Sequence, residues 1–335
     1  MGFKRLDAED FVVSADAVQG VAWSTGAPTL TQFFTSSVQY AGSSGDYYLS
    51  IFQTGSGDSS AAVQFDIAYA DILGSGSALF NPGITGKSPS STIYGQYRSL
   101  VLEDETAGFT FGDGTNTLSA NNFWAISVER ARYKEKLFPG TFNLHLSSSN
   151  GLIKLTDNSG DTKIQTFLGS NRVLQVVSGS NGNAFDTTGF VANSGSYGLF
   201  LPDIGTIILN PYAISQSIHV DADRTETTNG INNRTLYNAI NLGANFQLNS
   251  EETITSDYVF VRSRNSEFNY SENPSFISGS TGEVIYNQFI NNPQVYVTTV
   301  GMYNDANELM AVAKLSKPLL KDFTKESLVR VKLDF

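Results

Sequence analysis

The chain has 335 residues, with 21 basic and 32 acidic side chains for a net charge of −11, and it contains no cysteine. The acidic balance excludes a general nucleic-acid binder, because phosphate contacts need clustered positive charge. The lack of cysteine excludes disulfides, thiolate metal sites and cysteine nucleophiles. No apolar run approaches the roughly 18 residues that span a bilayer, and the first ten residues lack the apolar segment of a secretory signal. We therefore expect no membrane insertion.

Alternation of apolar and polar residues is the main secondary-structure signal along the chain. Strands are predicted over residues 47–52, 63–70, 123–128, 142–147, 172–177, 204–209, 258–262 and 329–335. Clusters of Gly, Ser, Asn and Asp between these segments favour the turns that join antiparallel strands. Helical patterns are few, with residues 235–242 as one candidate and residues 319–328 as a weaker one. The sequence predicts a mainly β fold of antiparallel, sandwich-like or barrel-like domains with few short helices.

Charge and composition divide the chain into three parts. Residues 1–138 carry a net charge of −6 and residues 201–335 carry −5, whereas residues 139–200 are neutral and rich in Ser, Gly and Asn. We predict an N-terminal β-rich domain over 1–138 and a small β insertion or subdomain over 139–200. A C-terminal β-rich domain over 201–335 would end in a hairpin and a terminal strand.

A basic stripe stands out in this acidic chain. Arg130, Arg132, Lys134 and Lys136 share one parity, so they would lie on one face if residues 124–136 form one extended segment. One interpretation is a solvated strand edge that charge protects from aggregation. The other is an interface that docks on an acidic neighbour, such as the acidic part of another copy of the chain. The pattern alone leaves both open.

Motifs that would signal catalysis or ligand binding are incomplete. Residues 81–88 nearly match a phosphate-binding loop, but Asn81 replaces the first glycine and no helical pattern follows Pro89, so we expect an ordinary loop. The only imidazoles are His145, on the polar side of its predicted strand, and His219, and no nucleophile elbow accompanies them.

The acidic clusters have similarly plain interpretations. Carboxylates at 103–105 and 251–252 favour solvated loops, because neighbours along a strand face opposite ways, whereas glycosidases place two acids across a sugar bond. Residues 157–161 have oxygen ligands but lack the glycine and closing glutamate of an EF-hand, which favours a turn over a calcium site. We predict no catalytic residues, no metal site and no cofactor.

The C-terminal region has the clearest local pattern. Segments 295–303 and 308–315 flank the turn-forming residues 304–307, which predicts an antiparallel hairpin with Val300 and Met302 facing Leu309 and Ala311. Pro318 should keep the second strand from continuing as a central strand. A short helical or irregular stretch would follow. The chain then ends in four apolar residues of one parity, which we expect to be buried in a sheet of this subunit or of a neighbour: Val329, Val331, Leu333 and Phe335.

Several stretches carry a resemblance to a known family. They are GKSPSSTIYGQYR (86–98), FWAISVERARYKEK (123–136), YGLFLPDIG (197–205), VGMYND (300–305), KLSKP (314–318) and VKLDF (331–335). In these stretches the chain resembles a family of virion structural proteins from contractile-tailed, T4-like phages of marine cyanobacteria. The resemblance implies a component of the phage particle and supplies no catalytic residues.

The sequence thus predicts a non-enzymatic virion structural protein, assembled in the host cytoplasm, that acts through protein–protein contacts in a symmetric assembly. A tail or baseplate position near the fibres is preferred, with the capsid or neck as the alternative. Expected partners are other virion proteins and copies of itself, with a host-surface glycan as a further candidate. Two rivals remain: a tail-associated glycan hydrolase using acids such as Glu103 or Glu251, and a carbohydrate-binding module using exposed Tyr and Trp.

Overall fold

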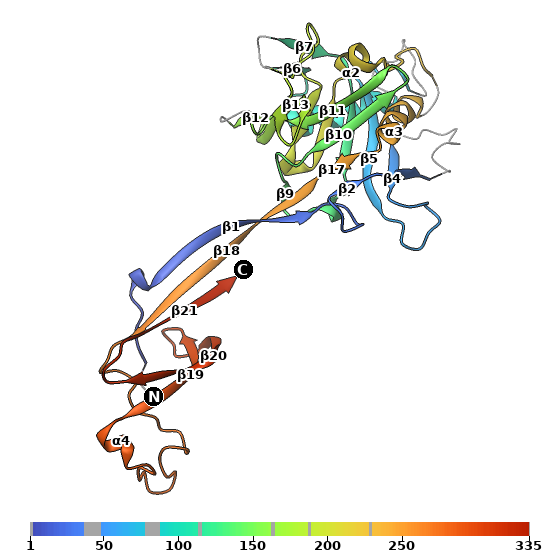
Figure 1. The fold of residues 1–335 in the computed structure, drawn as a ribbon. Coiled ribbons are helices and arrows are strands. Elements are labelled where there is room, and N and C mark those ends of the chain that lie inside the picture. The colour runs from blue at the N-terminus through green and yellow to red at the C-terminus, as the bar shows by residue number, and fades with distance from the viewer. Residues whose placement is uncertain are drawn as a thin grey trace. The chain divides into compact units, whose positions relative to one another are not determined.

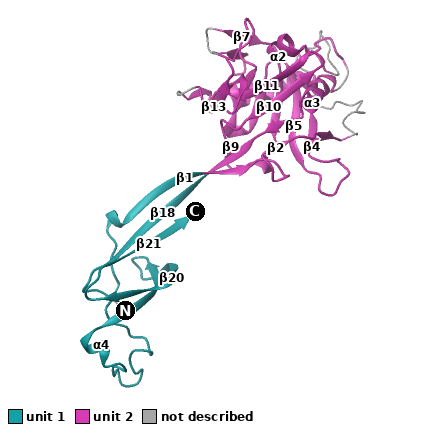
Figure 2. Ribbon diagram, in the orientation of Figure 1, with its two compact units in different colours: residues 1–17, 253–335 teal, residues 18–252 magenta. Residues whose placement is uncertain are grey.

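The computed structural model of the chain describes residues 3–36, 48–77, 88–112, 116–161, 165–186, 189–227 and 230–334. The chain forms two compact units (Figure 2). Unit 1 comprises residues 1–17 and 253–335, and unit 2 comprises residues 18–252. Two strands, β1 (Phe11–Val21) and β18 (Asn249–Ser263), carry the chain from one unit into the other.

A large antiparallel sheet that forms a half-barrel dominates unit 2 (Figure 1). Its order in the described chain is β2 (Thr29–Leu30), β17 (Phe246–Gln247), β10 (Asn143–Ser148), β11 (Gly151–Asp157), β13 (Asn171–Ser180), β15 (Gly198–Leu201), β16 (Thr206–Leu209), β8 (Asn122–Val128), β5 (Val63–Asp71), β4 (Leu49–Phe52) and β3 (Phe34–Thr35). Two short strands, β12 (Thr166–Leu168) and β14 (Asn183–Ala184), pair with β13 alone. The mainly β, antiparallel fold predicted from the sequence is confirmed.

The central strands of this sheet are buried on both faces. Along β8, Trp124 and Ile126 belong to one apolar core, whereas Phe123 and Ala125 belong to a second core on the opposite face. This arrangement explains the nearly continuous apolar run of residues 123–128, which an antiparallel sheet with one wet face would not need.

Different elements cover the two faces. The first core receives residues from α2 (Pro211–Ile218) and α3 (Ile231–Gly243). The second core receives residues from α1 (Pro89–Tyr97), from the π-helical turn η3 (Arg98–Leu102) and from the hairpin of β6 (Phe109–Gly112) and β7 (Thr117–Ala120). The predicted helix over 235–242 is confirmed within α3.

Helix α1 is absent from the sequence prediction. Its Ser- and Thr-rich sequence has low helix propensity, but Pro89 occupies the first turn, where a missing N–H is harmless. Ser88 precedes the helix, its N–H donates to Ser91 Oγ and its Oγ donates to Gly74 O at 2.8 Å. Packing of Tyr94 against Phe109 and Phe123 then stabilises the helix.

The compact units divide the chain at other positions than the three predicted parts. Residues 139–200 supply β10, β11, β13 and β15, which lie between β17 and β16 in the large sheet. This segment is therefore continuous with the core of unit 2. Its Ser, Gly and Asn content reflects the turns that join its strands, and composition does not show which sheet those strands enter.

Unit 1 contains one open sheet and one hairpin. The sheet has the order β1–β18–β21, and β21 (Ser327–Asp334) pairs antiparallel with residues 256–263 of β18. The hairpin joins β19 (Gln294–Tyr303) to β20 (Leu309–Asp322). A short helix, α4 (Gln288–Asn291), precedes β19, and a 3-10 turn, η1 (Ala8–Asp10), precedes β1.

The predicted hairpin is present, with a different register and length. Met302 pairs with Ala311, but Val300 pairs with Ala313 and Leu309 pairs with Tyr303, so the predicted facing of Val300 and Met302 with Leu309 and Ala311 holds only in part. The strand β20 continues through Pro318 to Asp322, so the predicted helix over 319–328 is wrong. Pairing is interrupted between Lys314 and Leu319, where a register shift leaves Pro318 outside the ladder, and β20 pairs only with β19 in the described chain.

The terminal strand alternates as predicted but is only partly covered. Val331 is 5% exposed, whereas Val329 and Leu333 are half-buried, and Phe335 lies outside the described residues. Within this chain Val329 and Leu333 are therefore not fully buried, and their burial against a neighbouring subunit stays a prediction.

Candidate functional site

The segment that carries the basic stripe is not one extended strand. The strand β8 ends at Val128, a 3-10 turn η4 spans Arg130–Arg132, and β9 (Lys136–Leu137) begins a new strand. The geometric premise of the stripe, a single parity along residues 124–136, is therefore wrong, because the turn changes the direction of the backbone.

Three of the four stripe residues interact within the chain. The Arg130 guanidinium donates to the carbonyl oxygens of Tyr133 at 2.5 Å and Lys134 at 2.6 Å, and it lies 4.7 Å from the centre of the Tyr133 ring. Lys134 Nζ lies 2.7 Å from a Glu252 oxygen, and Lys136 Nζ lies 3.9 Å from a Glu251 oxygen. Two lysines thus link residues 134–136 to the start of β18. Docking on another subunit stays a prediction.

Arg132 differs from the other three. It closes η4, it is partly buried, and its Nε has no hydrogen-bond partner among the described residues.

The carboxylates considered for glycan hydrolysis bind other groups of the same chain. Glu103 follows η3 with a φ of +54°, and its carboxylate accepts from the Ser170 N–H at 2.8 Å. Hydrogen bonds from Ser170 lower the pKa of Glu103, whereas a general acid needs a raised pKa. Glu251 and Glu252 lie on β18 and face Lys136 and Lys134.

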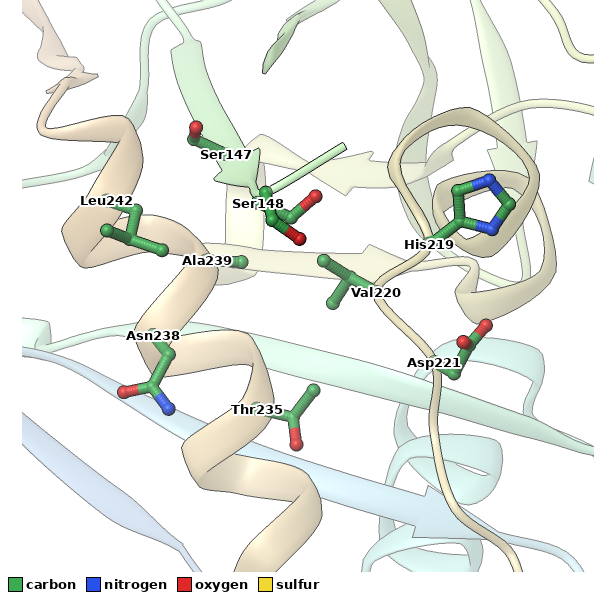
Figure 3. A pocket seen from close by; sticks show the side chains of 10 residues that line it. Ser147, Ser148, His219, Val220, Asp221, Thr235, Asn238, Ala239 and Leu242 are labelled. Atoms are coloured by element: carbon green, nitrogen blue, oxygen red, sulfur yellow. The ribbon is translucent and has the colours of Figure 1, made fainter. Parts of the chain in front are cut away.

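The two histidines lie in different surroundings. His145 pairs across strands with Lys154, and burial together with that lysine lowers the pKa of the imidazole. His219 follows α2 with a φ of +52° and borders a shallow cleft of about 250 Å3 (Figure 3). The other lining residues come from the end of β10, the loop after α2 and helix α3: Ser147, Ser148, Ser149, Val220, Asp221, Thr235, Asn238, Ala239 and Leu242.

Three polar side chains of this cleft, Ser148, Thr235 and Asp221, bind groups other than His219. Ser148 Oγ donates to Ile218 O, Thr235 Oγ1 donates to Ile231 O, and Asp221 accepts from Ser215. A nucleophilic triad needs the serine to donate to the histidine and the acid to orient that histidine. Ser148 instead donates to the Ile218 carbonyl and Asp221 accepts from Ser215, so neither side chain contacts His219 as a triad requires.

The acidic segment 157–161 forms a turn, as predicted. The buried Asp157 carboxylate accepts from the N–H groups of Gly140 and Ser159 at 2.8 and 3.0 Å, and Asp161 accepts from Ala184 N–H. In the described residues, no group of three His, Cys, Asp or Glu side chains is placed to hold a metal ion. Residues 81–87 of the phosphate-loop-like motif lie outside the described residues; a helix, α1, does begin at Pro89, contrary to the prediction.

The largest unexplained surface feature is the exposed apolar side chains of unit 1. Among its described residues, only Val259, Val295 and Val331 are apolar and fully buried. Large apolar side chains that are exposed number sixteen: Phe3, Phe11, Val12, Val13, Phe268, Tyr270, Ile285, Tyr286, Ile290, Tyr296, Tyr303, Leu309, Met310, Val312, Phe323 and Leu328. Where such side chains form a contiguous surface, they mark an interaction site.

Some of these exposed residues lie together at two places in unit 1. At the hairpin end, Phe3 and Tyr303 stack edge to face with centroids 5.0 Å apart, and a Cβ built on Gly301 would meet the side chains of Tyr303 and Leu309. In β1, the consecutive residues Phe11, Val12 and Val13 are all exposed. The strand β1 is absent from the sequence prediction, although its run of three apolar residues is a visible signal.

Both tryptophans are buried, which corrects one part of the carbohydrate-binding rival. Trp23 is 3% exposed and Trp124 is fully buried, and their indole N–H groups donate to the backbone carbonyls of Phe246 and Asn232, respectively.

No described helix is long and apolar enough to cross a membrane. Comparisons with protein-family models, with curated proteins and with solved structures give no match.

Proposed function

We propose that this chain is a non-enzymatic structural protein of a phage particle, located in the tail or baseplate and acting through protein–protein contacts in a symmetric assembly. The observation that carries the proposal is the exposed apolar surface of unit 1. Sixteen large apolar side chains are exposed there among the described residues, against three apolar side chains that are fully buried. A partner that covers this surface would supply the burial that the unit lacks by itself.

The sequence supports the same class. The chain resembles virion proteins of contractile-tailed cyanophages over stretches that lie in both units, and a mainly β fold offers strand edges for assembly. Particle components bind through large interfaces and need no active site. The capsid or neck is the alternative location, because the resemblance names a particle and no position within it.

Gold-labelled antibodies against the chain, applied to purified particles and viewed by electron microscopy, test the location. We expect label at the tail or baseplate. Label at the capsid or neck would keep the structural class and change the position. Purified particles that lack the chain by mass spectrometry would overturn the proposal.

An activity assay tests the enzymatic rival. The purified chain should release no sugar from host envelope polysaccharide or peptidoglycan, because Glu103 and Glu251 are held by other groups of the chain. Turnover that disappears in Glu103→Gln or Glu251→Gln, while Glu105→Gln remains active, would replace the structural proposal with a hydrolase.

A further inference from the structure

We propose that unit 1 joins copies of this chain to one another, with the β1 edge of one copy paired to the β21 edge of the next. The inference rests on the proposed function, because it names the partner of the surface that would assemble. The partner that binds this surface is therefore a second copy of the chain.

The sheet of unit 1 has two open edges. The central strand β18 separates β1 from β21, and in the described chain neither outer strand pairs with any other strand. Each outer strand therefore presents a row of backbone N–H and C=O groups that can extend the sheet. Natural edge strands are commonly protected by lysine or proline, and β1, eleven residues long, contains neither.

The faces of β1 are open as well as its edge. Successive side chains of a strand point to opposite faces, yet Phe11, Val12 and Val13 are 50%, 48% and 69% exposed. Neither face of this part of β1 is covered within the chain. A neighbouring copy placed at the edge would pair the backbone and shield side chains on both faces.

The two edges carry opposite charge. The strand β1 contains one acidic side chain, Asp16, and no basic one, and the residues just before it add Asp7, Glu9 and Asp10. The strand β21 contains Arg330 and Lys332, both exposed, and one acidic side chain, Asp334, which lies 2.8 Å from Lys332. Complementary charge sets partner and register at interfaces. It favours β1 against β21 over a contact between two like edges.

A charge-reversal experiment on the purified full-length chain tests this pairing. One variant carries Glu9→Lys with Asp16→Lys, and the other carries Arg330→Glu with Lys332→Glu. Each variant sets like charges against each other at every contact, so we expect the apparent dissociation constant of the oligomer to rise at least about tenfold in native mass spectrometry. Mixing the two variants in equal amounts should restore the oligomer, because each β1 edge then meets a β21 edge of opposite charge.

The matched control for the first variant is Glu283→Lys with Asp305→Lys, which makes the same change of net charge at exposed positions of unit 1 outside both strands; it should leave the oligomer intact. Circular dichroism verifies that each variant is folded. A wild-type chain that is monomeric at its highest soluble concentration, or variants whose mixture stays monomeric, would overturn the inference. If that monomeric chain is still found in particles, the proposed function stands and a different virion protein covers unit 1.

Discussion

Unit 2 and unit 1 are both built mainly from antiparallel strands, but they differ in how far consecutive side chains on those strands are buried. In β8 of unit 2, the neighbours Phe123 and Trp124 are both fully buried, because α1 and the β6–β7 hairpin cover one face of the sheet and α2 and α3 cover the other. In β1 of unit 1, the neighbours Phe11 and Val12 are both about half exposed. The strands are alike, and what differs is the presence of covering layers.

The few buried groups of unit 1 include polar ones. Lys321 is fully buried, and its Nζ donates to Asn265 O, Asn269 Oδ1 and Asp322 O at 3.1, 2.9 and 2.9 Å. A buried ammonium needs such acceptors to offset its lost hydration. Hydrogen bonds to loop residues therefore hold this end of β20 in place, where unit 2 uses packed aromatic rings.

Removing residues 329–335 is the most severe test of unit 1. The deletion takes most of β21 away from β18 and uncovers Val259, which is 1% exposed. We expect insoluble or unassembled protein, measured by the soluble fraction and by incorporation into particles. The loss comes mainly from the missing strand, because only Val331 of the three described side chains is fully buried. A truncated chain that stays soluble, melts like the full chain and enters particles would show that the strand is dispensable.

Phe65→Ala tests the core of unit 2. Phe65 is fully buried, and its ring lies 5.1 Å from Phe246 and 6.1 Å from Trp23. The cavity should lower the free energy of unfolding by about 3–5 kcal/mol, measured by urea titration followed by circular dichroism, which reports on the strands of both units. The control is Phe323→Ala in unit 1, where the ring is 49% exposed and the change should stay within about 0.5 kcal/mol. Equal losses in the two variants would contradict the contrast between the units.

The sequence predicts the strands of unit 2 best where apolar and polar residues alternate along the strand. Alternation over 63–70 and 142–147 corresponds to β5 and β10, because each has one face on the aromatic core. Alternation also placed β21, but it could not show that unit 1 lacks a covering layer. Helix α1 was missed because packing and a favourable start override the weak propensity of its serines and threonines.

The partners of the basic stripe residues could not be predicted from the sequence. Lys134 and Glu252 are 118 positions apart, and only the pairing of β9 with β18 brings them together. A charge pattern shows which groups are cationic and does not show whether they meet an acid of the same chain or of a neighbour.

Asp157 gives unit 2 a pH dependence of known sign. Burial raises the pKa of its carboxyl above the ordinary value of 3.8. The folded chain therefore keeps this proton at pH values where the unfolded chain has released it, and stability falls as pH rises from about 3.8 through the raised pKa. Compared with Asp157→Asn, which does not titrate, the wild type should be relatively most stable below pH 4 and least stable at neutral pH. Urea titrations of both chains across this range check the sign, and a parallel pH profile for the two would contradict it.

Asp157→Ala complements that measurement at neutral pH. The N–H groups of Gly140 and Ser159 lose their acceptor, which should cost about 1–3 kcal/mol where they remain buried. The asparagine variant keeps one acceptor oxygen and should lose less. Equal losses for alanine and asparagine would show that the hydrogen bonds are not what holds this turn.

The smallest effect is expected at the pair of Lys134 and Glu252. The lysine side chain is 73% exposed, so Lys134→Glu should lower stability by only about 0.2–1 kcal/mol, and less at high salt. The exchange Lys134→Glu with Glu252→Lys restores a pair of opposite charges at the positions that lie 2.7 Å apart in the wild type, and it should recover the stability. Incorporation into particles then separates the two roles of the stripe. We expect the exchanged chain to assemble like the wild type, because the pair links two segments of one chain. If assembly stays impaired while stability recovers, a neighbouring subunit binds the positive charge at residue 134. The basic stripe would then be an interface.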